Sequence, residues 1–213
     1  MRVLTILGHP RQRGFNWTLH QEVGRFCRAN KFPHRTIDLY REDFDPVVRE
    51  SEPDINRRMV ENYQEMIAWA EVVVIISPVW WYRCSTMMEG FFDKVMTNGF
   101  AFSVAHDSRG REHISPLLTG KTAIAFLSFG TDTPFNRIVL ANVARARLLG
   151  GVLSQCFGWM GSSTVGFFGM NSPNGHPIAV ESAITRLRGI APERHSMIKK
   201  ITSKIWARLT RNS

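Results

Sequence analysis

The feature that most limits how this chain can fold is a pair of short segments that are apolar on both faces. Glu71–Ser77 and Lys121–Ser128 each contain a run of β-branched and other apolar residues of strand length. Such runs are typical of strands inside a parallel sheet that has helices packed on both of its faces. These two segments therefore predict an α/β fold in which neither face of the sheet meets water.

The rest of the chain alternates between strand-like and helix-like segments. The other strands are predicted at Arg2–Leu7, His34–Leu39 and Ser163–Gly169, and the helices at Trp17–Ala29, Asp54–Ala70, Thr86–Val95, Asn136–Leu149 and Ile178–Arg188. This order predicts a doubly wound five-stranded parallel sheet with helices on both faces. Five strands favour a flavodoxin-like strand order, while a larger dinucleotide-binding fold stays open as the alternative.

Length and composition indicate one domain followed by a basic tail. The chain has 213 residues, of which 44% are hydrophobic and 21% charged, as in globular proteins. We expect a flavodoxin-like domain over residues 1–190 and a basic amphipathic C-terminal helix or tail over residues 191–213. The longest apolar runs are strand-sized, and the N-terminus resembles a first strand more than a signal peptide. We therefore expect a cytoplasmic protein.

The net charge of +9 attracts anions without identifying one. Part of it lies in the tail, where Ile198, Ile201, Ile205 and Leu209 form an apolar stripe opposite the basic residues. We expect this stripe to pack on the domain or on a second subunit. Peripheral contact with an anionic membrane, or with an acidic protein, is the alternative. No nucleic-acid-binding motif accompanies the charge, so we expect no nucleic-acid partner.

The three cysteines, Cys27, Cys84 and Cys156, lie far apart in the sequence. They form no CxxC pair, and no Cys/His cluster has metal-ligand spacing, so we expect reduced thiols and no metal site. Cys84 lies in an aromatic loop and is the alternative candidate for a reactive thiol.

Ligands of doubly wound sheets bind beyond the carboxyl ends of the strands, which makes three loops important. The first, residues 8–16, joins a strand to a helix, so its N–H groups and the positive helix terminus attract phosphate. Arg11 and Arg13 add charge, and His9 and Asn16 add hydrogen-bonding groups. Dinucleotide-binding and P-loop fingerprints are both absent from the sequence. The alternative is an ordinary polar turn with Asn16 as the helix N-cap.

The second loop places a proline and three large rings directly after a predicted core strand, in the run Pro78-Val79-Trp80-Trp81-Tyr82. Flat rings and backbone groups at this position suit a planar heterocycle. The alternatives are that the rings pack in a subunit interface or fill the core. Three adjacent rings cannot all point inward, so we expect some to be exposed or in contact with a partner.

The third loop, Ser128–Pro134, offers Gly130 and several hydroxyl groups at the end of another core strand. Together the three loops predict a pocket with a phosphate end and a flat apolar end. Those two ends suit a flavin.

Three stretches resemble the NAD(P)H:quinone oxidoreductase family, which has a flavodoxin-like fold, and the related ancillary proteins of potassium-efflux systems. They are GHPRQRGFN in the first loop, FDPVV at Phe44–Val48, and SPVWWYRCSTMMEGFFDKVMTNGFAF from Ser77. The resemblance runs from Met1 to about Ile190 and is most specific in the last of these stretches.

This resemblance implies a homodimer with two flavin sites at the subunit interface, FMN or FAD as cofactor, and NAD(P)H as electron donor. It also implies two-electron hydride transfer through the flavin to a quinone or a similar flat acceptor. The cofactor-binding residues that it implies are His9, Arg13, Gly14, Phe15 and Asn16 at the phosphate and ribityl end, Pro78, Val79, Trp80, Trp81 and Tyr82 along the ring, and Ser128, Phe129, Gly130 and Thr131 at its other edge.

The chain departs from the family at four positions. The animal quinone reductases have a tyrosine and a histidine where this chain has Phe135 and Ala141, and two substrate-slot tyrosines where it has Phe102 and Val104. The pocket is therefore expected to be less protic, and the resemblance identifies no catalytic side chain. Two alternatives stay open: a flavin-binding regulatory subunit of a membrane transport system and a one-electron carrier flavodoxin.

Overall fold

The computed structural model describes residues 1–51, 53–170 and 177–190. The predicted tail, residues 191–213, therefore lies outside the described residues. Among the residues that the structure does describe, no helix has the length and hydropathy needed to cross a membrane.

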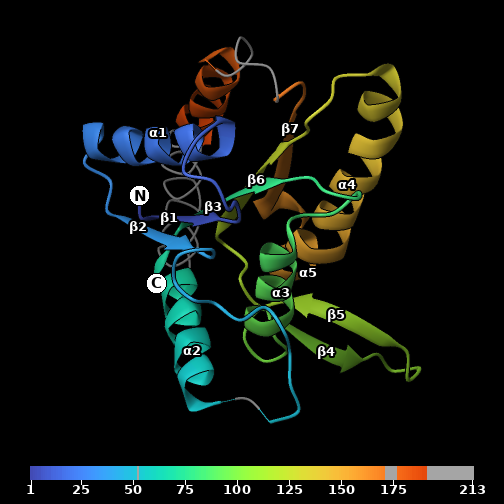
Figure 1. The fold of residues 1–213 in the computed structure, drawn as a ribbon. Helices are drawn as coiled ribbons and strands as arrows, with labels where there is room; N and C mark the ends of the chain where they lie inside the picture. The colour runs from blue at the N-terminus through green and yellow to red at the C-terminus, as the bar shows by residue number, and fades with distance from the viewer. Residues whose placement is uncertain (52, 171–176, 191–213) are drawn as a thin grey trace, which may run out of the picture.

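A five-stranded parallel sheet forms the centre of the molecule (Figure 1). Its strands are β1 (Val3–Leu7), β2 (His34–Asp38), β3 (Val72–Pro78), β6 (Thr122–Ser128) and β7 (Ser162–Phe167). Their order in the sheet is β2-β1-β3-β6-β7, and every neighbouring pair is parallel. This is the predicted flavodoxin-like order, with the switch of direction between β1 and β3.

Helices cover both faces of the sheet, as the doubly apolar strands predict. Alternate residues of β3 show the division, because Val72, Val74 and Ile76 pack with α1 (Phe15–Ala29) and the helix at 177–190. Val73 and Ile75 pack on the other face, with α2 (Asp54–Trp69), α3 (Thr86–Val95), α4 (Ala141–Leu148) and α5 (Ser154–Phe157). Burial on both faces explains why the sequence of β3 shows no polar alternation.

The structure contains a hairpin that the sequence pattern did not predict. Strands β4 (Phe102–His106) and β5 (Glu112–Pro116) pair antiparallel and project from the body of the molecule (Figure 1). Val104 pairs with Ile114 and both side chains are exposed, so the middle of the hairpin buries little apolar surface. Strands with little buried surface lack the strong period that identifies a strand from sequence.

The predicted helix at Asn136–Leu149 is a composite in the structure. A π-helical segment at Asn136–Leu140 precedes α4, and a second at Leu149–Leu153 leads into α5, before a 3-10 turn at Trp159–Gly161. Helix α1 begins at Phe15, two residues before its predicted start. Local helix boundaries depend on capping contacts, which apolar periodicity does not report.

Candidate functional site

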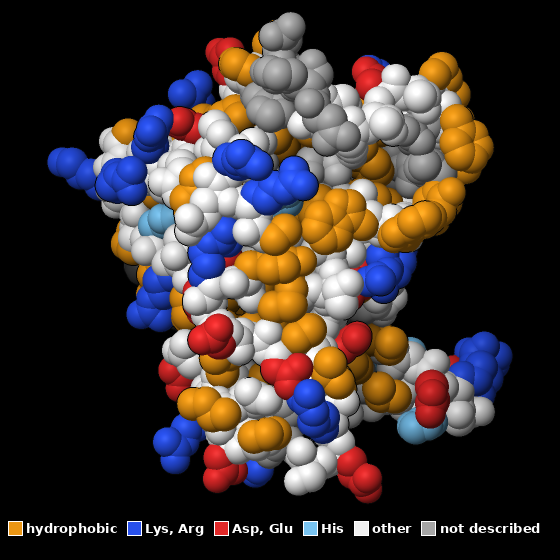
Figure 2. Space-filling view, viewed as in Figure 1, with side chains coloured by type: hydrophobic (Ala, Val, Ile, Leu, Met, Phe, Trp, Pro, Cys, Tyr) orange, Lys and Arg blue, Asp and Glu red, His pale blue; other side chains and the backbone are white. Residues whose placement is uncertain are grey.

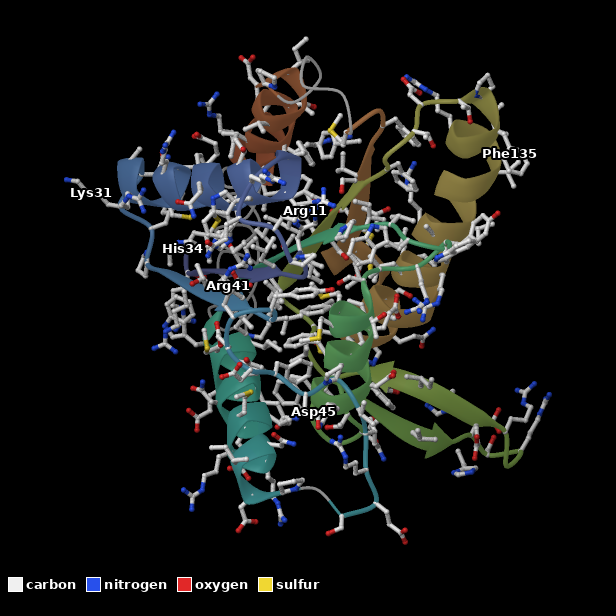
Figure 3. All side chains as sticks on the ribbon, in the orientation of Figure 1. Arg11, Lys31, His34, Arg41, Asp45 and Phe135 are labelled. Carbon is white, nitrogen blue, oxygen red and sulfur yellow. The ribbon has the colours of Figure 1, made fainter. Side chains whose placement is uncertain are left out.

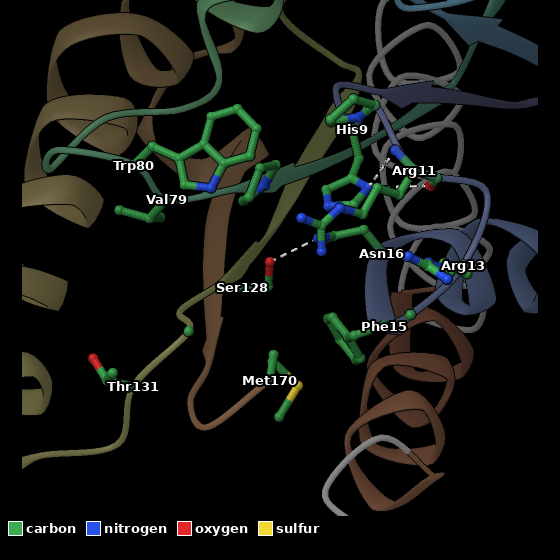
Figure 4. Close-up of a pocket in the computed structure, with 14 residues that line it drawn as sticks. His9, Arg11, Arg13, Phe15, Asn16, Val79, Trp80, Ser128, Thr131 and Met170 are labelled. Atoms are coloured by element: carbon green, nitrogen blue, oxygen red, sulfur yellow. Dashed lines mark hydrogen bonds between the residues drawn. The ribbon is translucent and has the colours of Figure 1, made fainter. Parts of the chain in front are cut away.

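A pocket of about 860 Å³ opens beyond the carboxyl ends of β1, β3 and β6 (Figure 4). The loops that follow these three strands supply most of its wall, as the sheet topology predicts. The pocket is lined by His9, Pro10, Arg11, Arg13, Gly14, Phe15, Asn16, Pro78, Val79, Trp80, Ser128, Gly130, Thr131 and Met170.

One end of the pocket is the N-terminus of α1. Gly14 is the N-cap residue, with φ 80° and ψ −176°, a backbone conformation that side-chain-bearing residues rarely adopt. The first turn of α1 contains no acidic residue, and Arg11 and Arg13 are exposed beside it. The terminus therefore combines its partial positive charge with two cations, which suits an anionic group.

Asn16 is not the N-cap, which makes the ordinary-turn interpretation of this residue wrong. It lies inside the first turn of α1, where its Nδ2 donates a hydrogen bond to Ser128 Oγ at 2.8 Å. Both side chains are buried, and Asn16 Oδ1 has no partner among the described residues. An unpaired buried acceptor costs free energy. A hydroxyl or N–H group of a ligand would donate the hydrogen bond that Asn16 Oδ1 lacks.

His9 stands at the same end, close to the flat wall. Its Nδ1 lies 3.2 Å from the backbone nitrogen and from the carbonyl oxygen of Arg11 (Figure 4). The pKa of His9 is lowered, mainly because partial burial disfavours the charged ring, against a backbone hydrogen bond that raises it. The ring centroids of His9 and Trp80 are 6.4 Å apart, which brings the first and second loops together.

The second loop is a tight turn that separates its three rings. Trp80 and Arg83 exchange two backbone hydrogen bonds, of 2.9 and 3.2 Å, around Trp81 and Tyr82, which have φ values of 50° and 66°. Trp80 lines the pocket together with Pro78 and Val79. Trp81 is 88% exposed, and neither it nor Tyr82 lines the pocket. The sequence predicts that some of these three rings are exposed, and Trp81 is the most exposed of them.

The turn is held in place from α3 and α4. Cys84 N donates to Glu89 Oε1 at 2.8 Å, and Arg147 contacts both oxygens of the same carboxylate, at 2.8 and 2.6 Å. Burial raises the pKa of the Cys84 thiol to about 12, and the Glu89 carboxylate adds to the shift. Such a thiol is protonated at neutral pH, so the structure does not favour Cys84 as a nucleophile.

The third loop contributes Ser128, Gly130 and Thr131 to the pocket, whereas Phe129 faces the core. Phe129 is buried and stacks on Phe168 with ring centroids 4.7 Å apart. Val79 N donates to Ser128 O at 2.8 Å, which joins the second and third loops.

The sequence interpretation missed Pro10 and Met170 as lining residues. It named Arg11 only as a source of positive charge, not as a residue that lines the pocket. Met170 follows β7, and its backbone nitrogen donates to Phe129 O at 3.0 Å. The carboxyl end of a fifth parallel strand lies at the same edge of the sheet, so topology could have indicated Met170.

Three of the four positions that depart from the quinone reductases lie outside the pocket lining of this chain. Phe102, Val104 and Phe135 are not lining residues, and Phe135 is 58% exposed. Ala141 is the first residue of α4. Among the described residues, no group of three or more His, Cys, Asp or Glu side chains could hold a metal ion.

Comparison with known proteins places this chain in a family. A family described by its flavodoxin-like fold matches residues 1–189. A curated relative, the uncharacterized NAD(P)H oxidoreductase YcaK of Escherichia coli (strain K12), is 28% identical over 113 residues, which cover 49% of this chain and 57% of the relative. The match thus spans little more than half the length of that relative.

Solved structures share the fold at low identity. The NAD(P)H:quinone oxidoreductase from Methanothermobacter marburgensis has a TM-score of 0.70 at 19% identity, covering 86% of this chain and 95% of that chain. The FMN-dependent NADH-azoreductase from Bacillus anthracis str. Ames Ancestor in complex with FMN has a TM-score of 0.65 at 17% identity, covering 87% and 98%. The chain therefore belongs to the flavodoxin-like fold family, which confirms the resemblance seen in its loops and the fold expected from its doubly apolar strands.

Proposed function

We propose that this protein is a flavin-dependent NAD(P)H oxidoreductase that reduces quinones or similar flat aromatic acceptors. The observation that carries the proposal is the pocket itself, which joins a cationic helix terminus to a wall of Trp80, Val79 and Pro78. The names of the relatives, an NAD(P)H oxidoreductase and an FMN-dependent NADH-azoreductase among them, support it.

The residues of the pocket fit a flavin along its length. The N-terminus of α1, with Arg11 and Arg13, would hold the phosphate. Asn16 Oδ1, buried and unpartnered among the described residues, would accept a hydrogen bond from a ribityl hydroxyl. Trp80 and the backbone of the second and third loops would border the ring.

FMN is the cofactor that we propose, with FAD as the alternative. The phosphate end suits a terminal phosphate monoester, whose two negative charges match two arginines. When bound, the flavin supplies the hydride chemistry, and NAD(P)H is the donor that the relatives' names support. The protein's own part is to orient the ring and to exclude water from one of its faces.

A homodimer would complete the site. Trp81 is highly exposed. Exposed apolar side chains also gather along the segment that leads into α4 and on α4 itself, at Phe135, Ile138, Val139 and Val143 (Figure 2). Exposed apolar surface of this kind is typical of interfaces. The cytoplasmic location and membrane contact through the tail stay predictions.

Purification and turnover test the proposal together. The purified protein should be yellow or should become so with FMN, and the flavin released on heating should be identified by chromatography. It should then oxidise NADH or NADPH over many turnovers with menadione as acceptor. Protein that stays colourless with both FMN and FAD would contradict the proposal. Flavin binding without turnover would favour the regulatory-subunit alternative over the enzyme.

A further inference from the structure

Arg41 lies outside the pocket wall but holds the first loop from behind. Its Nη2 donates to Pro10 O at 2.8 Å, and its Nη1 lies 3.3 Å from His9 O. Nη1 also contacts both carboxylate oxygens of Asp38, at 2.9 and 3.0 Å. Figure 3 shows Arg41 beside β2, near the loop that carries Arg11. Two consecutive loop carbonyls are thus tied to one guanidinium.

We propose that Arg41, held by Asp38, is the positioning residue of the phosphate end of the pocket. It acts on the ligand through the first loop rather than by contact, because it is absent from the lining. This inference rests on the proposed function, in which that end binds the phosphate of a flavin.

The fold explains why Asp38 and Arg41 meet at this loop. Leu7 and Asp38 are register partners at the ends of β1 and β2, so Asp38 lies where the first loop begins. Arg41 N donates to Asp38 O at 2.9 Å, a turn that brings the Arg41 side chain back over the loop. The guanidinium lies 5.4 Å from the ring centre of Trp17, which adds an anchor on α1.

The contacts of Arg41 also determine the position of the His9 ring. The carbonyl and the N–H of one planar peptide unit point in opposite directions. Fixing the Pro10 carbonyl toward Arg41 therefore fixes the Arg11 N–H on the opposite side, where it meets His9 Nδ1 at 3.2 Å. The ring of His9 in turn lines the pocket.

The charge of Arg41 also favours binding of a phosphate at this end of the pocket. Loop carbonyl oxygens carry partial negative charge, and an oxygen turned toward the pocket would repel a phosphate. Arg41 holds those of His9 and Pro10 away from it and adds positive charge behind the loop. Asp38 balances that charge locally and keeps the guanidinium in one orientation.

Binding of two flavins tests the proposal, because riboflavin has the ring and ribityl chain of FMN without the phosphate. Dissociation constants of both are measured by fluorescence quenching on flavin-free protein for the wild type, Arg41→Gln, Arg41→Lys and Arg35→Gln. Arg35 is the matched control, since it also lies on a tryptophan, at 4.4 Å from the ring centre of Trp69, and its loss removes the same charge.

Arg41→Gln should weaken FMN binding about tenfold and riboflavin binding less than about twofold, as expected for loss of charge-assisted hydrogen bonds at one end of the ligand. Arg41→Lys should fall between Gln and the wild type, and Arg35→Gln should change neither constant. Arg41→Lys also serves if Arg41→Gln does not fold, because it keeps the charge while losing the guanidinium that holds both loop carbonyls. Equal weakening of both flavins, or no change, would overturn the positioning role. A wild type that binds neither flavin would instead overturn the proposed function on which this inference rests.

Discussion

Asn16 and Ser128 lie 112 residues apart in the sequence, yet Asn16 Nδ2 donates a 2.8 Å hydrogen bond to Ser128 Oγ in the floor of the pocket. Both residues are 5% exposed. The bond joins the first turn of α1 to the last residue of β6, so it fixes the phosphate end of the pocket relative to its third loop.

Removing the hydroxyl of Ser128 should destabilise the protein more than removing an equally buried hydroxyl elsewhere. Ser128→Ala leaves the buried Asn16 amide without its acceptor, and we expect the free energy of unfolding to fall by about 1–3 kcal/mol. Ser154→Ala is the control, because the Gly150 carbonyl that Ser154 contacts keeps Gln155 Nε2 as a donor at 3.2 Å. Urea denaturation measures both, and equal losses would contradict the role assigned to the bond.

Gly14→Ala should weaken both the fold and FMN binding. An added Cβ meets nothing within 4 Å, so the cost comes from the backbone, with φ at 80°, and should be about 1–3 kcal/mol. Gly99 has φ 84° and equally open surroundings but lies outside the pocket lining. Gly99→Ala should therefore reduce stability without changing the FMN dissociation constant. A loss of FMN affinity in both variants would show that the effect is not local.

Substitutions of Trp80 and Trp81 should have different effects, the first on flavin binding and the second on the association of subunits. Trp80→Ala removes part of the flat wall and should weaken FMN and riboflavin alike, by about tenfold for a lost stacking contact. Trp81 lies outside the pocket of its own chain, so Trp81→Ala should alter the oligomeric state seen by sedimentation before it alters the flavin spectrum. Flavin loss from a Trp81→Ala protein of unchanged oligomeric state would contradict this division.

Acid should destabilise the folded protein through His34, whose ring is held between β2 and β1. Burial, with smaller effects of His20 and Arg28, lowers the pKa of His34 from 6.5 to about 4, and the ring contacts Thr5 Oγ1 at 2.9 Å. Above pH 6.5 the ring is neutral in both the folded and the unfolded state, so it adds no pH dependence. As the pH falls from 6.5 to about 4 the unfolded state binds the extra proton, so stability is lost in this window and levels off below it.

Urea denaturation at several pH values between 6.5 and about 4 measures how the free energy of unfolding depends on pH. His34→Gln should make the free energy of unfolding less dependent on pH between 6.5 and about 4. His113→Gln, which changes an exposed histidine of the β4–β5 hairpin, should leave the slope as it is in the wild type. An unchanged slope in His34→Gln would show that other groups, His20 included, carry the acid sensitivity.

The sequence by itself determined the sheet, the order of its elements and the edge at which the pocket opens. Val72–Ile76 is apolar at every position, and a strand buried on both faces requires helices on each side. The carboxyl ends of parallel strands lie at one edge, so the positions of the three loops followed from topology, and most of the expected lining residues are found there.

Only the tertiary structure decided which side chains of those loops meet. Positive φ values at Trp81 and Tyr82 turn these residues away from the pocket that Trp80 lines, while Phe129 stacks on Phe168 instead of facing the pocket. The bond between Asn16 and Ser128 and the hold of Arg41 on the first loop join residues far apart in the sequence. Residue patterns indicate local structure, because they reflect the period of a helix or strand. These contacts instead depend on how distant segments pack, which only the folded chain determines.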